Sequence, residues 1–190
     1  MENKNFLAAV YGHIDKFWTN SEKNEFSWVS DQLNRIPPGF FVCQIRPDRQ
    51  DNMWLYLTVG LSQTHTKNNE HIEFFILSPK EDSIHIETLT MLASFHADPN
   101  YGVYLGKVIN IGRPWLEKSI CTYFLTSLPY PFGPDFEWIK MGEGNIRILW
   151  LLPITPNEAQ FVQLHGQDRL EKKFEELEIN FLDPDRPSVV

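Results

Sequence analysis

Two short His-x-Glu patterns are the residues of this chain whose types and spacing come closest to a catalytic motif. Glu73 follows His71 at this spacing, and Glu87 follows His85. Zinc deaminases combine such a pair with a Pro-Cys-x-x-Cys segment that supplies the remaining ligands, and the sequence has no such segment. On a strand, His71 and Glu73 would share one face, as two exposed polar side chains also do. We therefore expect no metal site.

The cysteines Cys43 and Cys121 are the other candidate reactive groups, and both stand inside apolar runs. A cysteine nucleophile needs an exposed thiolate and a neighbouring base, whereas a cysteine within a strand packs as a small apolar side chain. The sequence also lacks a phosphate-binding loop, a dinucleotide-binding glycine motif and a nucleophile elbow. We therefore expect reduced core thiols, no bound cofactor and no enzymatic activity.

The formal net charge of −8 over 190 residues bears on the choice of partner. An acidic chain is repelled by nucleic acids and by anionic membranes, and it attracts positively charged surfaces. No run approaches the roughly 20 apolar residues that cross a bilayer, and the first residues do not form a signal peptide. The sequence predicts an acidic cytoplasmic protein whose partner is a protein, with neither nucleic acid nor membrane bound, and it leaves the oligomeric state open.

Apolar residues recur at helical spacing near the N-terminus and alternate along several later runs. This pattern predicts helices over residues 2–19, 82–96 and 156–166. Strands are predicted over residues 40–45, 53–61, 71–77, 119–125, 136–141 and 146–154. Strands outnumber helices and several follow one another directly, which favours a single α+β domain with a mixed, largely antiparallel sheet and helices packed on it. The expected domain covers residues 1–182, and residues 183–190 are expected to fray.

The most specific local signal lies where the last predicted strand ends. Thr155 stands at a helix N-cap, Pro156 at the first helical position, and Glu158 three residues after the cap. This order predicts a capping box, in which the Thr155 hydroxyl accepts from the Glu158 amide and the Glu158 carboxylate accepts from the Thr155 amide. A cap of this kind is worth roughly 1 kcal/mol. It would carry a buried strand directly into a helix.

Several pieces of the chain, taken in order, resemble the suppressor of fused domain family. Together they span residues 40–178, and their order is more specific than any one of them. The pieces are the aromatic strand 54–62 ending in Gly-Leu-Ser, the strand 73–77, the helix and turn 89–106, the strand 119–129 ending in Leu-x-x-Pro, and the segment 151–158 with Gly166 and Leu170 after it.

The resemblance implies binding rather than catalysis. Eukaryotic members of the family restrain a transcription factor by clasping a short peptide as an added strand. Their clasp uses a second domain that this chain lacks, and an acidic residue directly after a glycine, where this chain has Lys107 after Gly106. Single-domain bacterial members are similar to immunity proteins of polymorphic toxin systems, many of whose toxins are nucleases with a basic cleft.

Our leading hypothesis is therefore a bacterial immunity protein, an antitoxin that neutralises a cognate toxin, with a nuclease as one candidate target. Charge complementarity would speed the encounter. The alternative is a scaffold or regulator that binds a short peptide by strand addition. The candidate binding surface comprises loops 98–114 and 128–135, although their aromatic residues would also fit beneath the loops themselves. The candidate residues are Tyr101, Tyr104, Lys107, Tyr130, Phe132, Asp135, Glu137 and Glu143.

Overall fold

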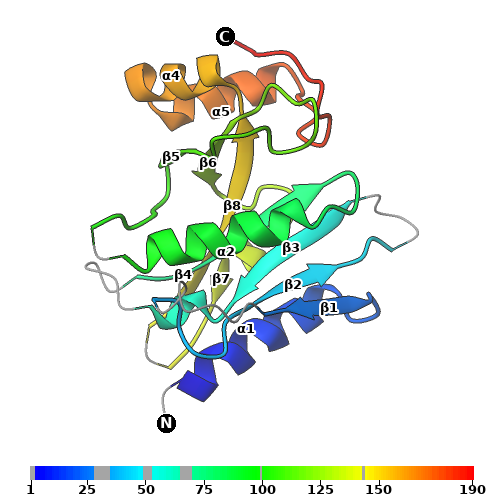
Figure 1. Cartoon of the computed structure of the whole chain (residues 1–190), viewed down its shortest axis with the longest axis vertical. Coiled ribbons are helices and arrows are strands. Elements are labelled where there is room, and N and C mark those ends of the chain that lie inside the picture. The colour runs from blue at the N-terminus through cyan, green and yellow to red at the C-terminus, as the bar shows by residue number, and fades with distance from the viewer. Residues whose placement is uncertain (1–2, 28–34, 49–52, 65–69, 99, 143) are drawn as a thin grey trace. The chain divides into compact units, whose positions relative to one another are not determined.

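The computed structural model describes residues 3–27, 35–48, 53–64, 70–98, 100–142 and 144–190 (Figure 1). The chain forms an α+β domain with a mixed, mostly antiparallel sheet and helices packed on it, as the sequence predicts. Its contacts cluster in two compact units, Met1–Val103 with Leu128–Trp150, and Tyr104–Ser127 with Leu151–Val190. No helix of the described part is long and apolar enough to cross a membrane.

The sheet of the first unit is built from β1 (Lys23–Phe26), β2 (Phe41–Ile45), β3 (Trp54–Val59), β4 (His71–Ser78), β7 (Trp138–Ile139) and the beginning of β8 (Ile146–Ile154). β1 pairs antiparallel with β2, β2 with β3, and β3 with β4. β4 then pairs parallel with β8, and β7 pairs antiparallel with β8. The parallel β4–β8 pair makes the sheet mixed. β1 lies at one edge of the strand order.

Helices α1 (Asn3–Phe17) and α2 (Ile84–His96) cover the two faces of this sheet (Figure 1). Successive side chains on β4 point to opposite faces, as on any strand. The Phe74 ring lies 5.5 Å from that of His96 on α2. The Phe75 ring lies 5.5 Å from that of Phe136, which in turn contacts Phe17 on α1 at 5.1 Å. Because β4 is buried on both faces, residues 74–77 are apolar without a break rather than alternating.

The second unit contains β5 (Val108–Asn110), β6 (Tyr123–Ser127), the end of β8, and helices α4 (Pro156–His165) and α5 (Gln167–Glu176). β5 and β6 pair antiparallel. The predicted capping box is confirmed. The Thr155 hydroxyl accepts from the Glu158 amide at 3.2 Å, and the Glu158 carboxylate accepts from the Thr155 amide at 2.8 Å. The sequence therefore identified correctly how β8 passes into α4.

The C-terminal residues depart from the frayed tail that the sequence suggested. Arg186 is 3% exposed, and its guanidinium donates to both carboxylate oxygens of Glu158, at 2.7 and 2.8 Å. It also donates to the Pro153 carbonyl at 3.0 Å, and the Val189 amide donates to Glu158 at 3.1 Å. Residues 183–190 are thus tied to the start of α4 by a buried ion pair.

Two element boundaries differ from the prediction for identifiable reasons. Residues 136–141 were predicted as one strand, but Pro134 opens the helical turn α3 (Pro134–Glu137), so that only the short strand β7 follows. The strand predicted over 119–125 is β6 and starts at Tyr123. The Ser119 hydroxyl accepts from the Trp115 indole and from the Cys121 amide, so the chain turns there. β1 carries no apolar alternation, so no local pattern predicts it.

Candidate protein-binding surface

A buried clamp on β4, rather than an exposed pair of polar residues, explains the first His-x-Glu pattern. Glu73 is fully buried, contrary to our prediction. Its carboxylate accepts hydrogen bonds from the Thr58 hydroxyl at 2.6 Å, the Gly60 amide at 2.9 Å and the Ser62 amide and hydroxyl at 3.0 and 2.7 Å. His71 Nδ1 lies 2.7 Å from the Ser62 carbonyl oxygen. The Gly-Leu-Ser segment is therefore a turn that β4 holds with two side chains.

The chemistry of this clamp is structural. Burial raises the pKa of Glu73 to about 7, while the hydrogen bonds from Thr58 and Ser62 pull it back towards lower values. Gly60 has a φ of 98°, and a Cβ there would lie 2.8 Å from the side chain of Leu7 on α1. Glycine is thus needed both for the left-handed backbone and for the close approach of α1.

The remaining titratable groups show no assembled reactive centre within the described residues. No group of three or more His, Cys, Asp or Glu side chains there could hold a metal ion. Cys43 and Cys121 are buried reduced thiols, and burial raises the pKa of both, that of Cys43 to about 12. A thiol with so high a pKa is not a nucleophile at neutral pH. His85 is buried and Glu87 is exposed on α2, so the second pattern lies on a helix.

The proline-rich loop places its candidate residues in different environments. Tyr130 is 57% exposed and Asp135 is also exposed. Phe132 is half-buried, with its ring 4.9 Å from that of Phe136 and 5.2 Å from that of Trp18. Phe132 therefore packs beneath its loop, which is the competing interpretation raised by the sequence.

The two acidic candidates beyond this loop are Glu137 and Glu143. Glu137 is not a freely exposed acid, because its side chain is only 12% exposed and forms an ion pair with Arg147 at 2.7 Å. Arg147 in turn lies over the ring of Trp138, at 5.0 Å from its centroid. Trp138 is 41% exposed and is an aromatic surface residue that the sequence did not single out. Glu143 lies outside the described residues.

Tyr104 and Lys107 belong to the second unit. Tyr104 is 54% exposed, and the Lys107 ammonium lies 5.4 Å from its ring centroid. The Lys107 amide donates to the Thr126 hydroxyl at 2.8 Å, which fixes the backbone before β5. Gly106, with a φ of 84°, leaves room for the side-chain amide of Gln167, with which an added Cβ would clash. Lys107 is therefore a cation whose backbone is held by Thr126 and whose ammonium lies over the Tyr104 ring.

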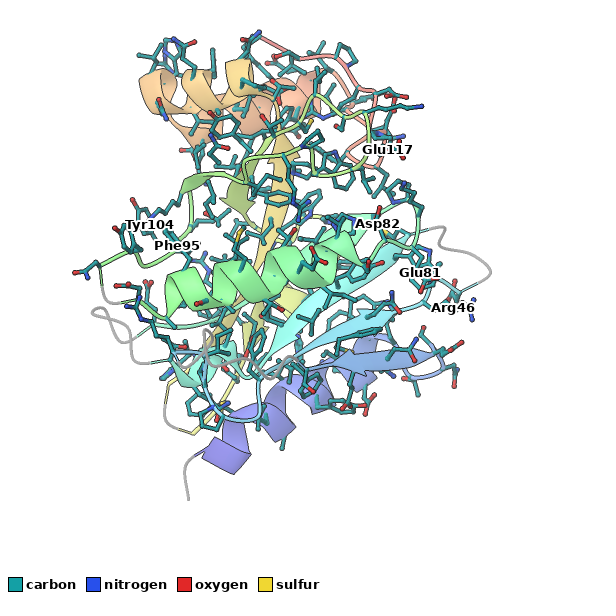
Figure 2. All side chains as sticks on the ribbon, viewed as in Figure 1. Arg46, Glu81, Asp82, Phe95, Tyr104 and Glu117 are labelled. Carbon is teal, nitrogen blue, oxygen red and sulfur yellow. The ribbon has the colours of Figure 1, made fainter. Side chains whose placement is uncertain are left out.

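Tyr101 lies in the first unit, on the loop that follows α2. Its ring is 52% exposed and stacks against that of Phe95, with centroids 4.9 Å apart and planes 29° from parallel. Figure 2 shows Phe95 near the C-terminal end of α2. Met91, one helical turn earlier, is 46% exposed. We call the group of Met91, Phe95 and Tyr101 the α2 ridge.

A profile of the family described as Suppressor of fused protein (SUFU) matches residues 37–187. The chain therefore belongs to the suppressor of fused family. It is similar over its whole length to a protein named Immunity protein YqcF from Bacillus subtilis (strain 168), with 23% identity over 202 residues that cover 97% of that protein.

Solved structures support the same assignment. A suppressor of fused homologue from Neisseria gonorrhoeae FA 1090 is 40% identical, with a TM-score of 0.86 and 98% of each chain covered. A structure described as the Sufu–Fu complex and one of Drosophila Suppressor of Fused share the fold, with TM-scores of 0.71 and 0.72 at 13% and 12% identity. The match covers 92% of the former chain and 51% of the Drosophila chain. The Neisseria homologue thus supports the family, and the other two structures show that the fold is shared.

Proposed function

We propose that this chain is an immunity protein, which neutralises a cognate toxin by binding it directly. The observation that carries the proposal is the similarity to Immunity protein YqcF, which extends over the full length of this chain. The exposed aromatic residues of the first unit supply anchors of the kind that dominate protein interfaces. The net charge of −8 suits a partner with a basic cleft, and a nuclease has one because it must hold a polyanion.

Co-expression with the toxin encoded by the neighbouring gene tests this proposal. Cells that make the toxin alone should stop growing, and cells that also make this chain should grow. The purified proteins should form a stable complex, observed by size-exclusion chromatography with light scattering. The matched control is an unrelated acidic protein of similar size, which should give no rescue. Absence of both a complex and rescue would refute the proposal.

A second candidate function, binding of an extended peptide by strand addition, is favoured by the geometry of β1. The Arg46 amide donates to the Glu22 carbonyl, which makes residues 22 and 46 a hydrogen-bonded pair in the β1–β2 register. Hydrogen-bonded and non-hydrogen-bonded pairs alternate along an antiparallel ladder. The main-chain groups of Lys23 and Glu25 therefore point away from β2, towards the outer edge of the sheet. That edge could accept a further strand.

Proline substitution separates strand addition from other modes of binding. Glu25→Pro removes an amide that points away from β2, so the fold should survive while an added strand loses a donor. Asn24→Pro, the matched control, removes an amide that donates to β2 and should destabilise the protein. The readout is binding of peptides selected from a displayed library. If no extended motif is selected, or if Glu25→Pro binds selected peptides normally, β1 is not a peptide-binding edge.

A further inference from the structure

The loop that carries Tyr101 is pinned at both of its ends. At the start, the Asp98 carboxylate accepts from the Asn100 amide at 2.9 Å and pairs with Arg35. The Tyr101 amide donates to the Asp98 carbonyl at 3.0 Å. At the far end, the Val103 amide donates to the buried Nδ1 of His96 at 3.0 Å. An aromatic side chain on a loop held in this way loses little freedom on binding, which favours affinity.

The α2 ridge contains this aromatic anchor, Tyr101, and also exposed apolar surface on α2. Glu87, Met91 and Phe95 follow one another at intervals of four residues, so they lie along one face of α2. Glu87 and Met91 are exposed, and Phe95 is half-buried beneath Tyr101. Aromatic residues and methionine are enriched at protein interfaces relative to the rest of the surface. The ridge therefore has the composition of an interface centre rather than of an ordinary solvated helix face.

Two of the acidic side chains of α2 and its N-terminal flank, Glu81 and Glu87, are exposed. Residues 81–106 contain four carboxylates and no lysine or arginine, and Lys80, directly before them, lies 3.7 Å from the Asp82 carboxylate. Glu81 and Asp82 lie at the N-terminal end of α2, as Figure 2 shows, and Glu87 lies between them and Met91 along the helix. The Asp98 carboxylate is already paired with Arg35. A partner that covers the ridge would thus meet the exposed carboxylate of Glu87 one helical turn from Met91, with Glu81 exposed just before α2.

We infer that the α2 ridge is the surface through which this chain binds its toxin, and that the matching surface of the toxin is an apolar hollow with a basic rim. This inference rests on the proposed immunity function. It selects one of the candidate loops, that of Tyr101, over the proline-rich loop of Tyr130. The charged rim would set the association rate, and the aromatic anchor would set the lifetime of the complex.

Substitutions at exposed positions test the inference with little risk to the fold. Tyr101→Ala and Met91→Ser should each weaken toxin binding about tenfold or more. The matched control is Leu164→Ala on α4, which removes an apolar side chain that is 70% exposed. It should leave binding unchanged. Binding is measured by calorimetry with a catalytically inactive variant of the neighbouring toxin, and circular dichroism reports whether each variant is folded.

Charge reversal provides an independent arm of the same experiment. Glu87→Lys should slow association and reduce its dependence on salt. Glu117→Lys changes the net charge by the same amount from an exposed position in the second unit, labelled in Figure 2, and should slow association less. Equal effects of the two reversals would show that only the overall charge matters, and would overturn the role assigned to the rim.

The outcomes distinguish this inference from the function on which it rests. If the unsubstituted chain neither binds nor rescues, the proposed function fails and the inference fails with it. If the unsubstituted chain binds and the ridge variants bind equally well, the function stands and the inference is overturned. A loss confined to Tyr130→Ala would also overturn it, because the interface would then lie on the proline-rich loop.

Discussion

Glu73 is the residue whose environment departs furthest from its sequence context. A carboxylate between apolar neighbours on a fully buried strand would be destabilising without partners. The Gly60–Ser62 turn supplies amide and hydroxyl donors to it. These donors come from a turn that lies more than ten residues away from Glu73 in the chain. The arrangement therefore depends on contacts between residues distant in sequence. The pattern His-x-Glu could not reveal this.

The raised pKa of Glu73 predicts a pH-dependent stability. Its pKa in the folded protein, about 7, lies above its ordinary value of 4.5. The folded state therefore holds the proton more tightly than the unfolded state, and stability falls as pH rises from 4.5 to 7. One pKa unit corresponds to about 1.4 kcal/mol, so the loss should be a few kcal/mol. Urea unfolding at a series of pH values measures it.

Glu73→Gln removes this titration and provides the comparison. Relative to Glu73→Gln, the original protein should lose unfolding free energy as pH rises towards 7. Above pH 7 the difference between the two proteins should be constant. Glu87→Gln, at an exposed position, is the matched control and should show no such trend. If the difference for Glu73→Gln does not vary with pH, Glu73 keeps an ordinary pKa in the folded protein.

Among the elements, those with a local cause were predicted well and those with a distant cause were not. The α4 capping box needs only residues 155–158, and its prediction was correct. β3, β4 and β8 are long apolar runs, and their prediction was also correct within about two residues, the usual disagreement at element ends. β1 depends on pairing with β2, which no local pattern of its polar residues reveals. The C-terminal segment likewise depends on Glu158, 28 residues before Arg186.

The binding candidates divide in the same way. Residue type and loop composition correctly suggested that Tyr101, Tyr104 and Tyr130 are exposed. The sequence could not show that Phe132 packs against Trp18, or that Glu137 pairs with Arg147, because each partner comes from another element. Met91 and Trp138 were missed, since an apolar residue on a helix or strand is normally expected in the core. Which of the exposed residues bind a partner remains a prediction.

The buried ion pair of the C-terminal segment predicts a large loss of stability on truncation. Deleting residues 183–190 leaves the Glu158 carboxylate buried without Arg186 and should cost about 3–5 kcal/mol. Arg186→Ala should have a similar effect, whereas Asp185→Ala, at an exposed neighbouring position, should have little. Chemical denaturation measures all three. If the truncated protein is as stable as the full chain, the domain ends at residue 182, as the sequence suggested.

At the scale of the whole molecule, the net charge of −8 bears on how fast a basic partner arrives. Electrostatic steering raises association rates and is screened by salt over about 10 Å at 0.1 M. The association rate with the toxin should therefore fall about tenfold or more as salt rises from low to high concentration, with a much smaller change in dissociation. Stopped-flow fluorescence measures both rates. An association rate that is independent of salt would exclude steering by charge.

The burial of both thiols makes the protein convenient for site-specific labelling. Cys43 and Cys121 are the natural sulfhydryl groups, and each is at most 1% exposed. Maleimide dyes react with thiolate, so the native protein should stay unmodified under conditions that label accessible sulfhydryls completely. A single cysteine introduced at any surface position would then carry the only fluorophore. Energy transfer between such a fluorophore and a labelled partner would give distances in solution without removal of the natural cysteines.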